Sequence, residues 1–138
     1  MLTSRNYQLA VTLCKEILTI KPDTPIVLNN LAWASAEMND PSALEYAEQA
    51  NKLLPNVPGI MDTLGWILVE RGDIARGLPL LQKAAEMAPS ALGIRLNLAK
   101  ALMRAGQKAA ARKELEFLDN NVSDPHGKEA VATLMRQL

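Results

Sequence analysis

Apolar and small residues recur along the chain at a spacing of 33 or 34 positions. We call the residues that occupy one position of this spacing a column. In one column each leucine is followed by a tiny residue, which gives the pairs Leu31-Ala32, Leu64-Gly65 and Leu98-Ala99. A second column holds the small residues Ala10, Ala43, Gly77 and Ala111. Twelve positions after these stand Pro22, Pro55, Pro89 and, breaking the pattern, Ser123. Several columns in one register indicate an internal repeat, so the chain is predicted to be built from stacked units.

Each unit is predicted to contain two helices. In residues 58–71, Ile60, Leu64 and Leu68 recur at four-residue intervals, which is typical of one face of a helix. Gly72-Asp73 is expected to end that helix and to cap the next one, and Gly106 is expected to end the corresponding helix one repeat later. Antiparallel helices approach closely only where side chains are minimal, so we expect Gly65 to face Gly77, and Ala32 to face the region of Ala43.

Three proline-containing turns refine these boundaries. Thr24-Pro25 and Asp124-Pro125 are each predicted to open a helix, with proline at the first helical position. In the first full repeat we expect Asp40 to be the cap and Pro41 the first helical residue. This repeat is one residue shorter than the next, and we place the deletion in the same turn. Pro79 lies about five residues inside a predicted helix, where it removes a backbone hydrogen bond. Either that helix is kinked or it begins later than Ile74.

The columns resemble the tetratricopeptide (TPR) repeat. The residues that match best are Leu64-Gly65, Gly72, Gly77, Ala84 and Pro89. The resemblance implies an all-α fold, a TPR-type right-handed superhelical solenoid of antiparallel helix pairs with about eight helices. It divides a single domain, 1–138, into a second helix of a truncated repeat (4–20), three full repeats (25–57, 58–91 and 92–125) and a terminal helix (125–138).

A narrower resemblance rests on two matching phrases one repeat apart. Asn29-Asn30-Leu31-Ala32-Trp33 and Asp62-Thr63-Leu64-Gly65-Trp66 are similar to the carboxy-terminal repeats of bacterial TPR lipoproteins that accompany PEP-CTERM/exosortase and exopolysaccharide systems. This resemblance implies a periplasmic, outer-membrane-associated location. Without it, the expected location is the cytoplasm.

The first helices of stacked TPR units line a concave surface, which is the usual binding face of such proteins. Helical geometry turns ten residues toward this surface: Asn29, Trp33, Glu37, Asp62, Trp66, Glu70, Leu96, Lys100, Met103 and Arg104. Trp33 and Trp66 share one column on adjacent helices, about 8–10 Å apart. Two interpretations remain open: the indoles anchor a ligand, or they form a structural spine along neighbouring helices.

Charge is balanced overall but segregated along the chain. Fifteen Lys and Arg residues match fifteen Asp and Glu residues, which argues against nucleic acid as a partner. Residues 25–70 nevertheless carry a net charge of −5, and residues 71–113 carry +7. This pattern either orients a partner with complementary charges or reflects solvated outer faces, with Glu70 and Arg104 paired between helices.

The chemistry-bearing residues are too few for an active site. One histidine, His126, and one cysteine, Cys14, provide neither a metal cluster nor a catalytic triad, so we expect no catalytic residues, no metal and no cofactor. Cys14 lies in an apolar stripe and is expected to be a packed thiol. No apolar run reaches the roughly 18 residues of a membrane span, so no direct membrane insertion is expected.

We therefore hypothesise a non-catalytic scaffold that binds a protein or peptide in its groove. Two alternatives stay open. The same tryptophans could bind polysaccharide, or the repeats could act as a spacer or oligomerisation element. An incomplete first repeat leaves one apolar face without a neighbour, which predicts self-association through the exposed terminal repeats.

Overall fold

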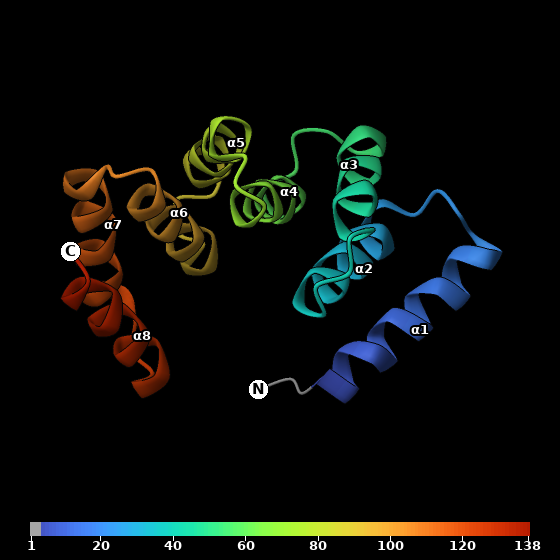
Figure 1. Cartoon of the computed structure of the whole chain (residues 1–138), viewed down its shortest axis with the longest axis horizontal. Coiled ribbons are helices and arrows are strands. Elements are labelled where there is room, and N and C mark those ends of the chain that lie inside the picture. Colours follow the sequence, from blue (N-terminus) through green and yellow to red (C-terminus); the bar gives the residue numbers. More distant parts are fainter. Residues whose placement is uncertain (1–3) are drawn as a thin grey trace.

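The computed structural model describes residues 4–138, which form eight α-helices (Figure 1). The helices are α1 (Ser4–Ile20), α2 (Pro25–Glu37), α3 (Ala43–Leu53), α4 (Pro58–Glu70), α5 (Ile74–Met87), α6 (Leu92–Arg104), α7 (Lys108–Asn121) and α8 (Pro125–Arg136). Residues 1–3, which belong to the predicted domain 1–138, lie outside the described residues. Residues 4–138 contain no strand, so the predicted all-α class with about eight helices is confirmed.

Consecutive helices pair and the pairs stack into an arch (Figure 1). The inside of the arch is lined by α2, α4 and α6, while α3, α5 and α7 lie on its outside. Helix α4 contacts both α2 and α6 directly, so the three inner helices form one continuous surface. The apolar faces of these short helices are buried mainly against neighbouring helices, as expected for a repeat protein.

Two glycines set the close approach of α4 to α5. A Cβ atom built on Gly77 would lie 2.5 Å from the carbonyl oxygen of Gly65 and 2.7 Å from Cγ2 of Val69. A Cβ on Gly65 would lie 3.0 Å from the carbonyl oxygen of Gly77. The predicted contact between these two glycines is confirmed, and in the preceding pair Ala32 and Ala43 share one buried cluster.

The turns within the three central helix pairs share a left-handed residue. Its φ angle is 58° at Asn39, 89° at Gly72 and 78° at Gly106, a conformation that favours glycine and tolerates asparagine. The predicted helix ends at Gly72 and Gly106 are therefore confirmed. Asp73 then caps α5, because its carboxylate accepts a hydrogen bond of 3.2 Å from the amide of Arg76.

The start of α3 differs from the prediction. The helix begins at Ala43, two residues later than expected. The amide of Ala43 donates to the carbonyl oxygen of Asp40, three residues back, whereas that of Gly77 reaches Asp73, four residues back. The side-chain oxygen Oδ1 of Asp40 also accepts a hydrogen bond of 2.9 Å from the amide of Ser42. This bond closes a turn that precedes the α-helix.

Helix α5 contains Pro79 in its interior. The helix begins at Ile74, so the predicted later start is wrong, and the predicted kink stays a prediction. Proline removes the hydrogen bond to the residue four positions earlier, which is Ala75. Both residues are exposed, so water can satisfy the carbonyl oxygen of Ala75. Solvent thus makes this helical proline tolerable.

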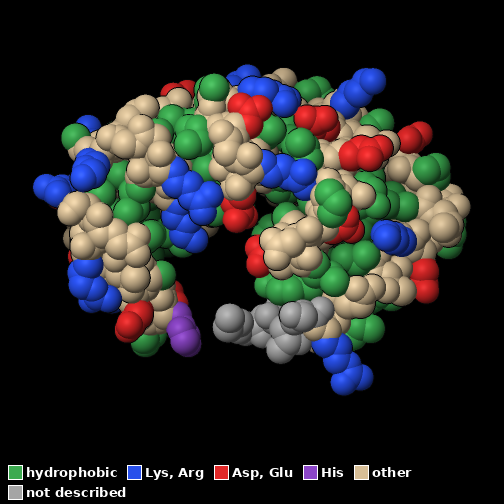
Figure 2. All heavy atoms as spheres, viewed as in Figure 1, with side chains coloured by type: hydrophobic (Ala, Val, Ile, Leu, Met, Phe, Trp, Pro, Cys, Tyr) green, Lys and Arg blue, Asp and Glu red, His purple; other side chains and the backbone are tan. Residues whose placement is uncertain are grey.

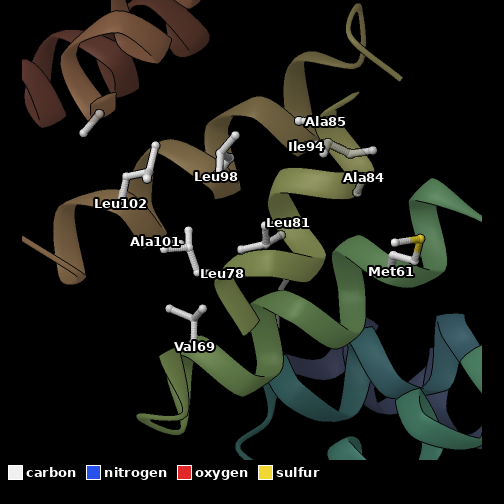
Figure 3. Packing of buried hydrophobic residues seen from close by; sticks show 11 residues of the cluster. Met61, Val69, Leu78, Leu81, Ala84, Ala85, Ile94, Leu98, Ala101 and Leu102 are labelled. Carbon is white, nitrogen blue, oxygen red and sulfur yellow. The ribbon is translucent and has the colours of Figure 1, made fainter. Parts of the chain in front are cut away.

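The buried core runs along the stack. Its largest cluster joins Met61 of α4, Leu81 of α5 and Leu98 of α6, and it reaches Ala111 of α7 (Figure 3). Side chains from successive helix pairs meet in this one cluster, so each pair completes the apolar environment of the next.

Helix α1 keeps an apolar stripe in contact with solvent. The exposed fractions are 55% for Leu9, 58% for Leu13, 45% for Ile17 and 80% for Ile20. The opposite side of the helix buries Val11 against α2. An apolar face of α1 is thus uncovered, as predicted for residues 4–20.

Candidate binding groove

The inner surface of the arch forms an open groove with segregated charge. Figure 2 shows Lys and Arg side chains along the left edge of the opening and acidic side chains above it and on its right edge. The left edge belongs to the α6 side of the arch and the right edge to the α2 side. The segregation read from the sequence therefore reaches the groove.

At the α2 end of the groove lies an apolar hollow of about 510 Å³, which we call the Trp33 hollow. Its lining residues are Ala10, Leu13 and Cys14 of α1, Asn29, Asn30, Trp33 and Ala34 of α2, and Thr63 of α4. The indole of Trp33 is 43% exposed and meets the ring of Tyr7 edge to face, with 5.4 Å between the ring centroids. One side of the indole is thus supported by α1, and the hollow is open to a ligand.

Polar atoms of the Trp33 hollow are only partly satisfied. The side-chain oxygen of Asn29 is buried and has no hydrogen-bond partner. The hydroxyl group of Thr63 is already engaged, because it donates to the carbonyl oxygen of Gly59 at 3.1 Å. A buried acceptor without a donor is costly, which favours any rotation of Asn29 that brings this oxygen to a hydrogen-bond donor.

Cys14 also borders this hollow but carries no activated thiol. Partial burial raises the pKa of Cys14 above its ordinary value, because the thiolate is disfavoured away from water. The sulfur therefore stays protonated at neutral pH and packs beside the hollow, and no thiolate forms there.

At the other end of the groove, two cations surround one indole in an arrangement that we call the Trp66 cluster. The Nζ atom of Lys100 lies 5.6 Å from the ring centroid of Trp66, and the guanidinium carbon of Arg104 lies 5.1 Å from it. Both are cation–π contacts. With Met103 and, from the C-terminal segment, Leu134 and Gln137, the cluster borders a second hollow of about 280 Å³.

Asp62 lies on the inner helix α4 and is held by α6. The side-chain amide of Asn97 donates to both of its carboxylate oxygens, at 3.1 and 3.3 Å. Burial raises the pKa of Asp62 to about 6, an effect that the bond from Asn97 opposes. At neutral pH the groove therefore contains a partly buried anion that is already bonded to an amide.

Comparison with known proteins shows to which family the chain belongs. The sequence profile of the tetratricopeptide repeat matches residues 68–138, slightly more than half of the chain. The chain belongs to the tetratricopeptide repeat family. Members of this family are protein-interaction scaffolds, and the coarse prediction of such a scaffold is consistent with this membership. No curated protein matches the sequence.

Solved structures share the TPR solenoid. A thermophilic TPR protein from Thermus thermophilus superposes with a TM-score of 0.82 at 21% identity, covering 96% of this chain and 74% of the other. The MamA structure of MSR-1 gives 0.72 at 21% identity, with coverages of 95% and 76%. An O-GlcNAc transferase mutant from Thermobaculum terrenum gives 0.67 at 24% identity, covering 97% of this chain and 23% of that one. The predicted all-α TPR solenoid is thus confirmed.

The TPR groove does not bring all ten predicted residues together. Asn29 and Trp33 meet in the Trp33 hollow, whereas Trp66, Lys100, Met103 and Arg104 surround the second hollow. Asp62 is bonded to Asn97 between the inner helices. The remaining three predicted residues, Glu37, Glu70 and Leu96, lie elsewhere.

Each of these three has a different environment. Glu37 lies near Tyr7, whose pKa is raised by burial and then by this negative charge. Glu70 lines a separate hollow beside the turn between α2 and α3. Leu96 packs against a buried cluster that includes Val131 of α8, so it faces the next helix. The assignment of Leu96 to the open groove stays a prediction.

One pairing predicted within the TPR groove is corrected, whereas the predicted spacing of Trp33 and Trp66 stays a prediction. In residues 4–138 no ion pair joins Glu70 to Arg104, because Arg104 lies over Trp66. Trp33 and Trp66 have separate partners, an aromatic ring on α1 and two cations on α6. The groove thus has two distinct ends.

Sequence reasoning missed the contribution of α1 to the Trp33 hollow. Ala10, Leu13 and Cys14 all line it, and Tyr7 supports the indole. Tyr7, an aromatic residue close to the apolar stripe, could have indicated this contact. Residues 4–20 were instead predicted to be the second, outer helix of a repeat.

Over residues 4–138, the structure contains no group of three or more acidic, histidine or cysteine side chains placed to hold a metal ion. None of the described helices is long and apolar enough to span a membrane.

Proposed function

We propose that the groove captures an extended segment of a partner protein, with an apolar side chain of that segment seated in the Trp33 hollow. One observation carries the proposal: a solvent-open apolar hollow of about 510 Å³ beside a 43% exposed indole. Exposed tryptophan on a concave, largely apolar surface is the typical anchor of a protein interface.

The polar atoms around the hollow suit a peptide backbone. On rotation of its side chain toward the hollow, the buried, unpartnered oxygen of Asn29 would accept a hydrogen bond from a backbone N–H of the bound segment. Trp33 would cover the anchoring side chain, and Leu13 would form the opposite wall. An extended segment presents its N–H groups beside its side chains, so it can satisfy Asn29 while its side chain fills the hollow.

The test is a selection of random peptides displayed on phage against the purified chain. Selected peptides, made synthetically, are expected to bind the wild type and to lose at least about tenfold in affinity on the double variant Trp33→Ala/Trp66→Ala, as hot-spot tryptophans do. Met87→Ala is the control, because this side chain is exposed on the outer helix α5. Circular dichroism verifies that helicity is retained, and unchanged binding by a helical double variant would refute the groove assignment.

A polysaccharide is the alternative ligand, since an exposed indole also stacks on sugar rings. Titration of tryptophan fluorescence with bacterial exopolysaccharide separates the two classes: sugar binding would change the emission, and a flat titration counts against it. The envelope location implied by the lipoprotein resemblance stays a prediction, which fractionation of the native cell would test.

A further inference from the structure

The Trp66 cluster holds two positive charges that have no acidic partner. Among residues 4–138, the ion pairs are formed by Arg76 and Arg95. Lys100 and Arg104 take part in none of them and contact the face of Trp66. The groove therefore presents two cations that are positioned by an aromatic ring and are available to an anion.

The positions of Lys100 and Arg104 on α6 bring their two positive charges close together. Lys100 and Arg104 are four residues apart on α6, so their side chains lie on the same face of the helix and repel each other. The indole holds both side chains while leaving their N–H donors free, because a cation–π contact uses the face of the ring. An anion placed between the two groups would relieve the repulsion and accept charge-assisted hydrogen bonds.

The hollow beside the cluster limits what the anion can belong to. It encloses about 280 Å³, and Met103 and Leu134 contribute apolar walls. A short side chain fits within this volume and can place a methylene stem against the apolar walls and a charged tip at the cations. Aspartate and glutamate have that construction, so charge and shape both favour a carboxylate of a protein segment.

We propose that Lys100 and Arg104 bind an Asp or Glu side chain of the same segment whose apolar residue occupies the Trp33 hollow. This inference rests on the proposed function. Neighbouring inner helices are spaced by about 8–10 Å, so the two sites are about 15–20 Å apart. An extended chain advances about 3.3 Å per residue, which separates the apolar and acidic residues by about four to six positions.

Charge reversal tests the proposal in the same phage selection. Peptides selected on the wild type are expected to be enriched in Asp or Glu about four to six positions from a large apolar residue. Lys100→Glu/Arg104→Glu is expected to replace that preference by Lys or Arg, and a synthetic acidic peptide should bind it at least about tenfold more weakly. The neutral variant Lys100→Gln/Arg104→Gln should lose the preference without reversing it.

A matched control is available on α7. Lys108 and Arg112 are also four residues apart, and both are exposed on a helix outside the groove. Lys108→Glu/Arg112→Glu changes the net charge by the same amount, so it should leave the acidic preference intact. If it abolishes that preference as completely as the α6 reversal, bulk charge is the cause and the proposal is overturned.

The outcomes separate this inference from the function on which it rests. Peptides that lose affinity on Trp33→Ala/Trp66→Ala but show no acidic enrichment would overturn the carboxylate site and leave the groove function standing. Unchanged specificity after reversal of Lys100 and Arg104, with helicity intact, would do the same. A selection that yields no groove-dependent peptide would overturn both proposals.

Discussion

Replacement of Gly77 by alanine tests the contact between α4 and α5 on which the helix pairing depends. The added Cβ would lie 2.5 Å from the carbonyl oxygen of Gly65 and 3.0 Å from the amide nitrogen of Val69. Backbone atoms cannot rotate away, so the helices must separate, at the upper end of the usual overpacking cost of about 1–3 kcal/mol. Alanine regains about 1 kcal/mol of helix propensity, which leaves a net loss of about 2 kcal/mol.

Gly93→Ala is the matched control for this substitution. Gly93 lies in the first turn of α6, and a Cβ there would meet nothing within 4 Å. The same chemical change should therefore stabilise the chain by up to about 1 kcal/mol, so the two variants should differ by about 3 kcal/mol. Urea unfolding followed by far-UV circular dichroism measures both. If Gly77→Ala is as stable as Gly93→Ala, the close approach does not limit packing and the reasoning fails.

Two further predictions concern pH and association. Because burial raises the pKa of Asp62 from 3.8 to about 6, its contribution to stability is fully present below pH 3.8 and is lost as the pH rises through 6, by up to about 3 kcal/mol. Asp62→Asn keeps an acceptor for Asn97, so its stability relative to wild type should increase from about pH 4 to pH 7 in urea titrations; a constant difference would contradict the assigned pKa. The exposed stripe on α1 predicts concentration-dependent dimers by light scattering. Leu13→Glu/Ile17→Glu should abolish them, and a wild-type chain that stays monomeric at high concentration removes the support for self-association.

The helix pairs were predictable because their constraint is steric and local. Gly65 and Gly77 recur in register with alanines, and the contact they predict is the one in which a Cβ would collide with backbone. Gly72 and Gly106 were equally informative, since a left-handed residue reverses the chain there. The start of α3 was not predictable to the residue, because a one-residue deletion can be absorbed either by the turn or by the helix.

The binding groove was harder to predict because it depends on neighbours. A column position shows that Trp33 and Trp66 turn inward, but it does not show which side chain each indole meets. Trp33 meets Tyr7 of α1, and Trp66 meets Lys100 of α6, so equivalent positions in adjacent repeats acquire different chemistry. Leu96 turns inward by the same rule and packs against a buried cluster that joins α6, α7 and α8, which no single-helix pattern contains.

The residues that pack the helix pairs together differ from those that face the groove, although both sets lie on the same helices. Helix α4 buries Gly65 against α5 on its outer face and offers Trp66 to the groove. The close packing of the pairs fixes the spacing of α2, α4 and α6, and that spacing fixes the distance between the Trp33 hollow and the Trp66 cluster. Under the proposed mode of binding, this fixed distance selects segments in which an apolar and an acidic residue are separated by the same span.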